Sequence, residues 1–340
     1  MIVLGLPDPE MALIERLGVA AGARVAYAMQ DGRRVGGSTP AAICDSDGTP
    51  ALDPDAESSR WHGLILVECP GADPGGHPGE VTIVDHHDSH PMASEPPARA
   101  AAASSVGQVV RLLGLDVCRE CGDRLDWTDQ SGPGWRPCFV HEDGAGDPYH
   151  RGPGECDGGG GAPVLGVRDD QAVGGLGTCG DLHRWPLYPG EYAEIRLTAA
   201  ADHCLGAAYR GDVPGVRPEV LGVWRAETRA AFQGRPVEDI LRDVEAAREW
   251  LAMVPRVPLG GVEVADMRSA GDVPELPEAA ARDGVAFVAI PKPGRDGPKV
   301  VLQAAPTEAV EAFLRGEGPA AGLVRLYGAP ARGFAGGYFA

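Results

Sequence analysis

Short apolar runs alternate with segments of helical periodicity through the first part of the chain. Strands are predicted at the apolar runs, because strands that are covered on both faces carry few polar residues. A helix is predicted where apolar residues recur every three or four positions, as Met11, Ile14 and Leu17 do. This alternation is typical of an α/β domain with a parallel sheet. The predicted elements are strands at 2–6, 24–28, 63–68 and 81–85, and helices at 10–20 and about 104–114, the last capped by Ser104 or Ser105.

The alternation stops at residues 115–190, which contain five of the eight cysteines and a run of four glycines at 158–161. This segment is therefore predicted to be an insertion. Helical periodicity returns at about 191–209, 217–232 and 236–252. The last part of the chain predicts strands at 262–266, 285–290, 299–303 and 323–327, and helices near 275–282 and at 307–315.

The order of these elements predicts two α/β domains. A length of 340 residues is enough for two hydrophobic cores. The first domain is expected to span 1–253 and to contain a parallel sheet and the insertion. Prolines at 255 and 258 and the pair Gly260-Gly261 predict a linker over 254–261. The second, smaller α/β domain is expected to span 262–340.

The net charge of −19 limits the class of partner. Such a charge repels extended duplex DNA, whereas small phosphorylated substrates, or single-strand ends that reach bound metals, remain compatible. No apolar run approaches the roughly 18–20 residues that cross a bilayer, and the N-terminus lacks the pattern of a signal peptide. We therefore expect a cytoplasmic protein without membrane partners, whose cysteines are reduced or metal-bound.

Acidic residues and histidines follow the predicted strands. Asp85-His86-His87 ends a strand, Glu68 ends the strand before it, and Asp8 and Glu10 follow the first strand. A further acid, Asp202, lies in the small-residue helix AAADHCLGAAY. The carboxyl ends of parallel strands meet at one edge of a sheet, where ligands bind. Carboxylates and imidazoles that converge there are the donor set for divalent cations that assist attack on phosphorus.

The string VTIVDHHDSHP resembles the third motif of the DHH phosphoesterase superfamily. This superfamily includes RecJ-type exonucleases, phosphodiesterases of short oligonucleotides and of cyclic dinucleotides, and family II pyrophosphatases. The resemblance extends over most of the chain, because the other acidic segments follow in the family's order. It implies a site for Mn²⁺ or Mg²⁺ in which His86 binds metal, Asp85 orients or ligates, and His87 faces the scissile phosphate.

The resemblance also gives roles to the remaining acids. Asp202 matches the fourth-motif aspartate that binds or bridges metal. Glu68 takes the second-motif position, where the family normally has Asp. Asp8 and Glu10 fall on the first motif, but the His of that motif is missing and its second Asp is Glu. A lone Asp at a strand end is also a frequent helix cap or turn former, and Asp8, between two prolines, is open to that interpretation.

The cysteine-rich insertion has the spacing of a structural zinc site. Cys118 and Cys121 are separated by two residues, sixteen residues follow, and Cys138 and His141 are again separated by two. Two close pairs of such ligands suit tetrahedral Zn²⁺, which would hold together a segment with few apolar residues. Three uses stay open for this module: nucleic-acid contact, a lid over the metals, or an oligomer interface such as that of a homodimer. Residues that can replace a ligand, form a second site or remain unpaired are Cys156, Cys179, His150 and His183.

The C-terminal string Arg332-Gly333-Phe334-Ala335-Gly336-Gly337 resembles the glycine-rich loop of the C-terminal domain in this superfamily, without its typical His. The resemblance implies that Gly333, Gly336 and Gly337 let the main chain approach a phosphate, while Arg332 contributes a bidentate charge. The alternative is a flexible tail. Arg268 is a further candidate to line the cleft that this segment would form with the first domain.

Together these patterns predict a divalent-metal-dependent phosphoesterase with its site between the two domains. The expected substrates are phosphodiester or phosphoanhydride bonds of nucleotides, short oligonucleotides or single-stranded nucleic-acid ends. Two other classes stay open. One is a catalytically degenerate relative that binds a nucleotide or nucleic acid, which the missing first-motif His favours. The other is a nucleic-acid-binding protein that acts through its zinc module.

Overall fold

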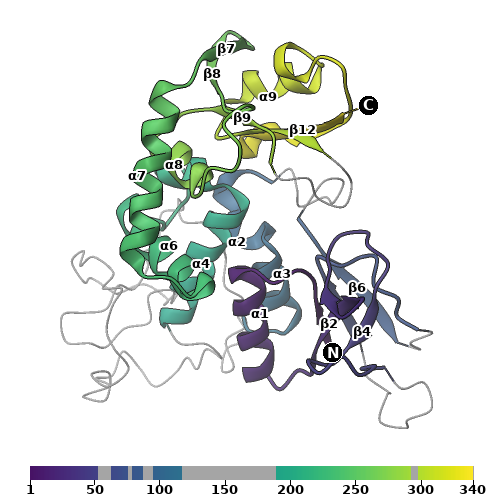
Figure 1. The fold of residues 1–340 in the computed structure, drawn as a ribbon. Helices are drawn as coiled ribbons and strands as arrows, with labels where there is room; N and C mark the ends of the chain where they lie inside the picture. Colours follow the sequence, from purple (N-terminus) through teal and green to yellow (C-terminus); the bar gives the residue numbers. More distant parts are fainter. Residues whose placement is uncertain (53–62, 76–78, 87–94, 117–188, 292–297, 340) are drawn as a thin grey trace, which may run out of the picture.

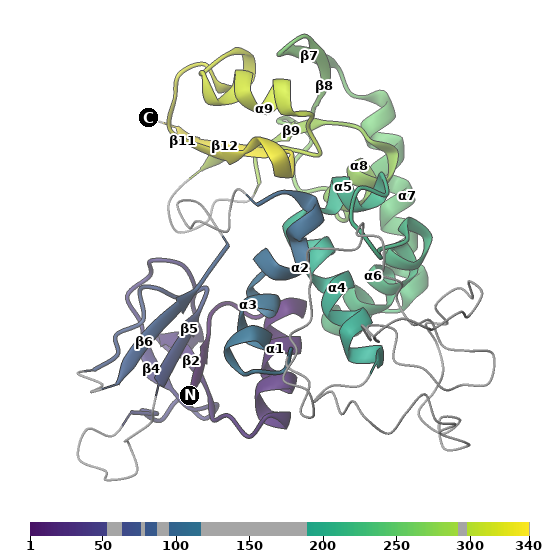
Figure 2. The same ribbon diagram turned by 180° about the vertical axis from the view of Figure 1, so that it is seen from behind.

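The computed structural model describes residues 1–52, 63–75, 79–86, 95–116, 189–291 and 298–339. Within these residues the fold is mixed α/β, with two six-stranded sheets and nine α-helices, which confirms the predicted class at that level. The two sheets lie at opposite ends of the molecule, and a layer of helices runs beside them (Figure 1). The view from behind shows α1 (Pro9–Ala20) and α3 (Ser105–Leu112) beside the N-terminal sheet, with α4 (Pro189–His203) on their other side (Figure 2).

The N-terminal sheet is built around a parallel core, as predicted. Its strand order is β3-β2-β1-β5-β6, with β4 also paired to β2. Four adjacent strands are parallel, in the order β2, β1, β5 and β6. Strands β3 and β4 run antiparallel to β2. The bounds are β1 (Ile2–Leu4), β2 (Val25–Gln30), β3 (Arg33–Arg34), β4 (Ala42–Cys44), β5 (Gly63–Val67) and β6 (Glu80–Val84).

The strand order reverses at β1. The chain leaves β1 through α1 (Pro9–Ala20) to reach β2 on one side, and β5 later pairs with β1 on the other side. Such a reversal leaves a crevice at the carboxyl ends of the central strands, because the connections leave in opposite directions. The segments that follow β1, β5 and β6 therefore meet at one edge of this sheet.

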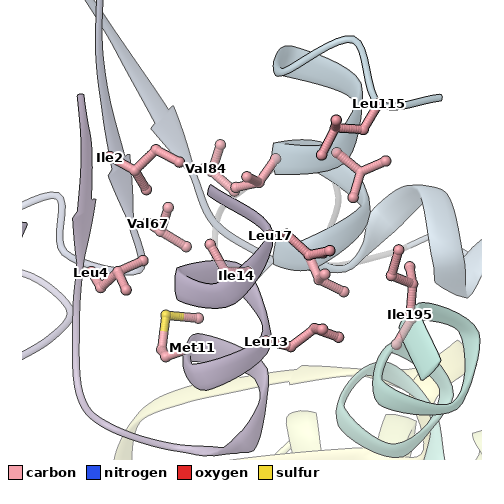
Figure 3. Packing of buried hydrophobic residues seen from close by; sticks show 14 of the residues in the cluster. Ile2, Leu4, Met11, Leu13, Ile14, Leu17, Val67, Val84, Leu115 and Ile195 are labelled. Atoms are coloured by element: carbon pink, nitrogen blue, oxygen red, sulfur yellow. The ribbon is translucent and has the colours of Figure 1, made fainter. Parts of the chain in front are cut away.

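Helices α1, α3 (Ser105–Leu112) and α4 (Pro189–His203) cover one face of the N-terminal sheet. Alternation along β1 places Ile2 and Leu4 on this face and Val3 on the opposite one. Figure 3 shows the helix-covered face, with the α1 side chains packed between the strands and α4. Labelled there are Ile2, Leu4, Met11, Leu13, Ile14, Leu17, Val67, Val84, Leu115 and Ile195.

The C-terminal sheet has the order β11-β12-β10-β9-β8-β7 and is antiparallel except for the pair β8 and β9. Helix α9 packs on one face through Phe313, and α7 and α8 pack on the other against Phe287. We call residues 256–339 the C-terminal lobe. Its elements are β7 (Arg256–Leu259), β8 (Val262–Asp266), α8 (Leu276–Asp283), β9 (Phe287–Ala289), β10 (Lys299–Gln303), α9 (Thr307–Leu314), β11 (Leu323–Ala329), the 3-10 turn η5 (Pro330–Arg332) and β12 (Phe334–Phe339).

Helices join the two sheets. The single helix predicted at 191–209 is two helices, because Cys204 has φ −155° and ψ 49° and so interrupts the helical path. The remaining helices are α2 (Ala100–Ala103), α5 (Leu205–Tyr209), α6 (Pro218–Gln233) and α7 (Val237–Met253).

Residues 254–261, predicted to be a linker, contain strand β7 instead. β7 pairs with β8 in an antiparallel hairpin whose turn is Gly260-Gly261, both with positive φ. Pro258 is compatible with this strand because β7 is an edge of the sheet, where an N–H need not be donated to a neighbour. Leu259 is buried in the core of the lobe. The prolines and glycines of this segment therefore shape a hairpin.

The predicted glycine-rich loop at 332–337 is also different, since most of it is strand β12, between β11 and β10. The glycines permit close packing: a Cβ on Gly336 would lie 2.4 Å from the Tyr327 ring, and one on Gly337 would lie 2.6 Å from Leu326 Cδ2. Gly333 lies just before β12 with a φ of 73°. The prediction of a loop or flexible tail is therefore wrong for this segment.

Two groups of predicted residues lie outside the described ranges. The first is His87. The second comprises the predicted zinc ligands and their alternatives, Cys118, Cys121, Cys138, His141, His150, Cys156, Cys179 and His183. The zinc site stays a prediction.

The packing of Gly336 gives a stability test. We expect Gly336→Ala to destabilise the protein by about 1–3 kcal/mol, the usual cost of overpacking, because the new methyl group would overlap the Tyr327 ring. Gly63→Ala is the matched control, since a Cβ there has only an ordinary contact at 3.8 Å. Urea unfolding of the three proteins measures both changes. Equal stability of the two variants would contradict this account of β12.

Candidate metal centre

Three carboxylates and one imidazole converge in the crevice of the N-terminal sheet. One potential ligand atom from each of Glu10, Glu68, His86 and Asp202 lies within 4.8 Å of all the others. Glu10 is in the first turn of α1, Glu68 directly follows β5, and His86 follows β6. Asp202 comes from the end of α4. The segments that follow β1, β5 and β6 thus supply three of the residues, and α4, distant in sequence, supplies the fourth.

Glu10 is held inside the protein, with 3% of its surface exposed. Its Oε1 accepts a hydrogen bond of 2.8 Å from the main-chain N–H of Val106, in the first turn of α3. Its Oε2 is buried and has no hydrogen-bond partner among the described residues. Burial, with Asp202 and Glu68 close by, raises the pKa of the Glu10 carboxyl well above its ordinary value. A buried oxygen without a partner next to two other carboxylates is the environment that a bound cation would relieve.

The main chain fixes Glu68 in an unusual conformation. Its φ of 53° lies in the left-handed region, which costs a non-glycine residue about 1–3 kcal/mol. The surrounding structure holds it there: its N–H donates to Val84 O at 2.9 Å, and its carbonyl accepts from Gly37 N at 2.7 Å. Gly5 of the neighbouring segment has no room for a side chain, because a Cβ would lie 2.8 Å from Glu68 O. The strained residue is therefore held between the ends of two strands.

Ser105 determines which ring nitrogen of His86 donates a hydrogen bond and which faces the cluster. The Ser105 hydroxyl donates to Glu68 Oε1 at 2.7 Å, so its oxygen is left to accept from His86 Nδ1 at 2.9 Å. Nδ1 therefore carries a proton, and Nε2 is the nitrogen directed to the cluster, 2.6 Å from Asp202 Oδ2. An imidazole lone pair and a carboxylate oxygen at this distance repel each other unless a proton or a cation lies between them. His86 is fully buried, whereas the Asp202 side chain is 37% exposed.

The end of α4 is held by a guanidinium from the C-terminal lobe. Arg332 Nε donates to His203 O at 2.6 Å, and Nη1 donates to His86 O at 2.8 Å. His203 packs edge-on against His86, with ring centroids 5.8 Å apart. Its Nε2 lies 3.1 Å from the carbonyl oxygen of Glu95 and so donates to it. Burial, together with the charge of Arg332, lowers the pKa of His203 to about 3, so this ring is neutral.

The donor set fits a divalent cation. Three carboxyl groups and one imidazole converge in the cluster, and the positive group beside it, Arg332, donates to main-chain carbonyls. Hard carboxylate oxygens with one imidazole suit Mn²⁺ or Mg²⁺. The prediction that these residues form a group able to bind a metal ion is confirmed, whereas the identity of the metal stays a prediction.

Two other predicted residues have different positions. Asp8 is the N-cap of α1, where its Oδ1 accepts from Met11 N at 2.7 Å, so the helix-cap interpretation is confirmed. Burial, with Asp202 nearby, raises its pKa. Asp85 accepts a 3.0 Å hydrogen bond from Gln108 Nε2 through its main-chain oxygen. For both residues the predicted role at the metal stays a prediction.

No sequence motif indicated a role at the candidate metal centre for Ser105 or His203. Ser104 and Ser105 were both candidate caps for α3, and Ser104 is the cap, accepting from Gly107 N at 3.1 Å. This leaves the Ser105 hydroxyl available to His86 and Glu68. His203 had no feature that set it apart from the other residues of its predicted helix. Its position next to Asp202 was the one sequence feature that pointed to the site.

Arg268, predicted to line the cleft, pairs instead with Asp266 in its own lobe, at 2.7 Å.

Comparison with protein-family models found no match, and neither did comparison with curated proteins or with solved structures. Among the described residues, no helix is both long and apolar enough to cross a membrane.

Ser105 can be tested against its neighbour. We expect Ser105→Ala to weaken Mn²⁺ binding about 10–100-fold, because residues that orient a metal-binding histidine typically contribute that much. Ser104→Ala is the control: it removes the cap of α3, at a cost of about 1 kcal/mol in stability, and leaves the His86 contact intact. Isothermal titration of the metal-free proteins measures both. Equal Mn²⁺ affinity in the two variants would show that Ser105 does not set the orientation or the tautomer of the His86 ring.

Glu10 should oppose stability in the metal-free protein. We expect Glu10→Gln to raise Tm at neutral pH by about 2–4 °C, the shift that roughly 1 kcal/mol produces in domains of 150–250 residues, because the substitution removes the cost of burying the carboxyl group that raises its pKa. The amide oxygen can still accept from Val106. The same variant should lose the Tm increase that Mn²⁺ gives the wild-type protein. A lower Tm without metal, or an unchanged response to Mn²⁺, would contradict the assignment of Glu10.

Proposed function

We propose that this protein is a divalent-metal-dependent phosphoesterase that hydrolyses phosphodiester or phosphoanhydride bonds. The observation that carries the proposal is the convergence of Glu10, Glu68, His86 and Asp202 at the order reversal of a parallel sheet. The resemblance of the motifs around these residues to those of the DHH phosphoesterases points to the same chemistry. Nucleotides, short oligonucleotides and single-stranded nucleic-acid ends are the proposed substrates.

The four residues of the cluster would hold Mn²⁺ or Mg²⁺. When bound, such a cation polarises a phosphoryl oxygen and lowers the pKa of water in the site. His86 presents Nε2 because Ser105 accepts the proton of Nδ1. Glu10 and Glu68 contribute oxygens from opposite sides of the strand order reversal. His87 keeps the role that the resemblance implies, next to the scissile phosphate.

The departures from the family's motifs are compatible with this role. Glu stands where the family has Asp at positions 10 and 68, yet both longer side chains bring an oxygen into the 4.8 Å group. The left-handed conformation of Glu68 and the deep position of Glu10 accommodate the extra length. The carboxylates therefore remain close enough to share one cation.

Asp8 favours a second candidate function. One of its two carboxylate oxygens caps α1, and the first-motif His is missing, so fewer ligand atoms are available than the family's motifs supply. A protein with one cation in this site could bind a nucleotide without hydrolysing it. This candidate is a metal-containing nucleotide-binding or nucleic-acid-binding protein. A test for hydrolysis separates it from the enzyme.

The experiment is a hydrolysis panel with Mn²⁺. Substrates are pyrophosphate, cyclic dinucleotides, di- to pentanucleotides and single-stranded DNA. We expect hydrolysis of at least one class, and a loss of about 100-fold or more in His86→Ala and Asp202→Asn, beyond the 10–100-fold that supporting residues contribute. Asp212→Asn is the control, because Asp212 pairs with Arg210 on the surface.

The outcomes are distinct. No hydrolysis of any substrate, together with nucleotide binding that survives in His86→Ala, would reject the enzyme and favour the binding protein. Hydrolysis that is equal in wild type, His86→Ala and Asp202→Asn would show that the activity does not come from this site.

A further inference from the structure

Arg332 belongs to the C-terminal lobe, yet its hydrogen bonds go to the N-terminal sheet and to α4. It ends the turn η5, directly before β12. Each of its three nitrogens donates to a main-chain oxygen: Nε to His203 at 2.6 Å, Nη1 to His86 at 2.8 Å, and Nη2 to Asp202 at 3.5 Å. The guanidinium thus contacts two segments that are far apart in sequence.

Two of these three oxygens belong to residues of the metal centre. His86 and Asp202 both point a side chain into the cluster and both present a main-chain oxygen to Arg332. Asp202 and His203 are also the last residues of α4, where carbonyl groups lack partners within the helix. A positive side chain at a helix C-terminus is favourable because it balances the helix dipole. Arg332 therefore satisfies the end of α4 and the end of β6 at once.

The lobe holds Arg332 in place. Gly333, which follows it, has a φ of 73°, and a Cβ at that position would lie 2.7 Å from Ala305 O. The carbonyl of Gly333 accepts from Ala305 N at 3.0 Å. The guanidinium lies over the Phe334 ring, 5.0 Å from its centroid. A fixed turn on a sheet thus carries the side chain, so the position of the C-terminal lobe sets the position of the guanidinium.

We propose that Arg332 is a positioning residue of the metal centre, which holds the segments of His86 and Asp202 in register through their main-chain oxygens. The inference rests on the metal centre of the proposed function, but it does not require hydrolysis. It replaces the role of phosphate clamp, because a substrate phosphate would have to compete with three carbonyl oxygens for this guanidinium. It also couples the C-terminal lobe to the metal centre: docking of the lobe against α4 and the end of β6 favours cation binding, and cation binding favours docking to the same degree.

The test measures Mn²⁺ binding by isothermal titration of the metal-free, full-length protein. We expect Arg332→Ala to weaken Mn²⁺ affinity about 10–100-fold, as loss of a residue that orients metal ligands does. Arg332→Lys should recover part of this loss, because one ammonium cannot reach three oxygens in the fixed geometry of a guanidinium. Arg268→Ala is the matched control, since this arginine of the same lobe pairs with Asp266, and its Mn²⁺ affinity should equal that of wild type.

Steady-state kinetics on the substrate found in the panel give the second measurement. If Arg332→Ala and Arg332→Lys bind Mn²⁺ as wild type does but show a raised KM, Arg332 is a substrate clamp and the inference is overturned. Unchanged Mn²⁺ affinity and unchanged KM would also overturn it. If circular dichroism shows that Arg332→Ala does not fold, Arg332→Lys decides: weaker Mn²⁺ binding supports the role, and wild-type affinity overturns it. A wild-type protein that binds no Mn²⁺ would overturn the metal centre itself, whatever the variants do.

Discussion

The mutual repulsion of three carboxylates around one buried imidazole is the constraint on which the rest of the structure depends. Glu10 has a buried oxygen without a hydrogen-bond partner among the described residues, and His86 lies 2.6 Å from Asp202 with its protonated nitrogen turned to Ser105. Such an arrangement is unfavourable unless a positive charge occupies its centre. A divalent cation meets this need, and the same cation would supply the phosphoryl chemistry that we propose. The same arrangement that costs stability in the metal-free protein would therefore favour binding of a cation.

The fold keeps these groups together by fixing the main chain more than the side chains. The sheet brings the ends of β1, β5 and β6 to one edge, and Glu68 is held in a left-handed conformation between them. Arg332 then joins the end of β6 to the end of α4. A second contact supports this geometry, because Glu278 of α8 is buried and binds Tyr209 of α5 and Arg225 of α6. The C-terminal lobe is therefore attached to the helical layer on the same side of the molecule that supplies Asp202.

The sequence predicted those parts of the fold that depend on local pattern. The near-continuous apolar runs located the parallel strands, and two acids and a histidine that follow them located three residues of the candidate metal centre, because both signals are local. The break at Cys204 and the strands β7 and β12 were missed. Pro258 is tolerated in β7 because this strand is an edge of the sheet, and Gly336 is favoured in β12 because the Tyr327 ring packs against it. No local pattern reveals either neighbour. The role of Ser105 was missed for the same reason: it depends on residues 68, 86 and 105 meeting in space.

The most direct test of the central claim is anomalous diffraction at the manganese edge from crystals of the protein grown with Mn²⁺. The account predicts a peak bounded by Glu10, Glu68, His86 Nε2 and Asp202, with His86 Nδ1 still within hydrogen-bond distance of Ser105. The absence of a peak there, with His86 and Asp202 in direct contact as a proton-sharing pair, would contradict it. In that case the cluster would be a structural ion pair, and the chemistry of this protein would have to lie elsewhere.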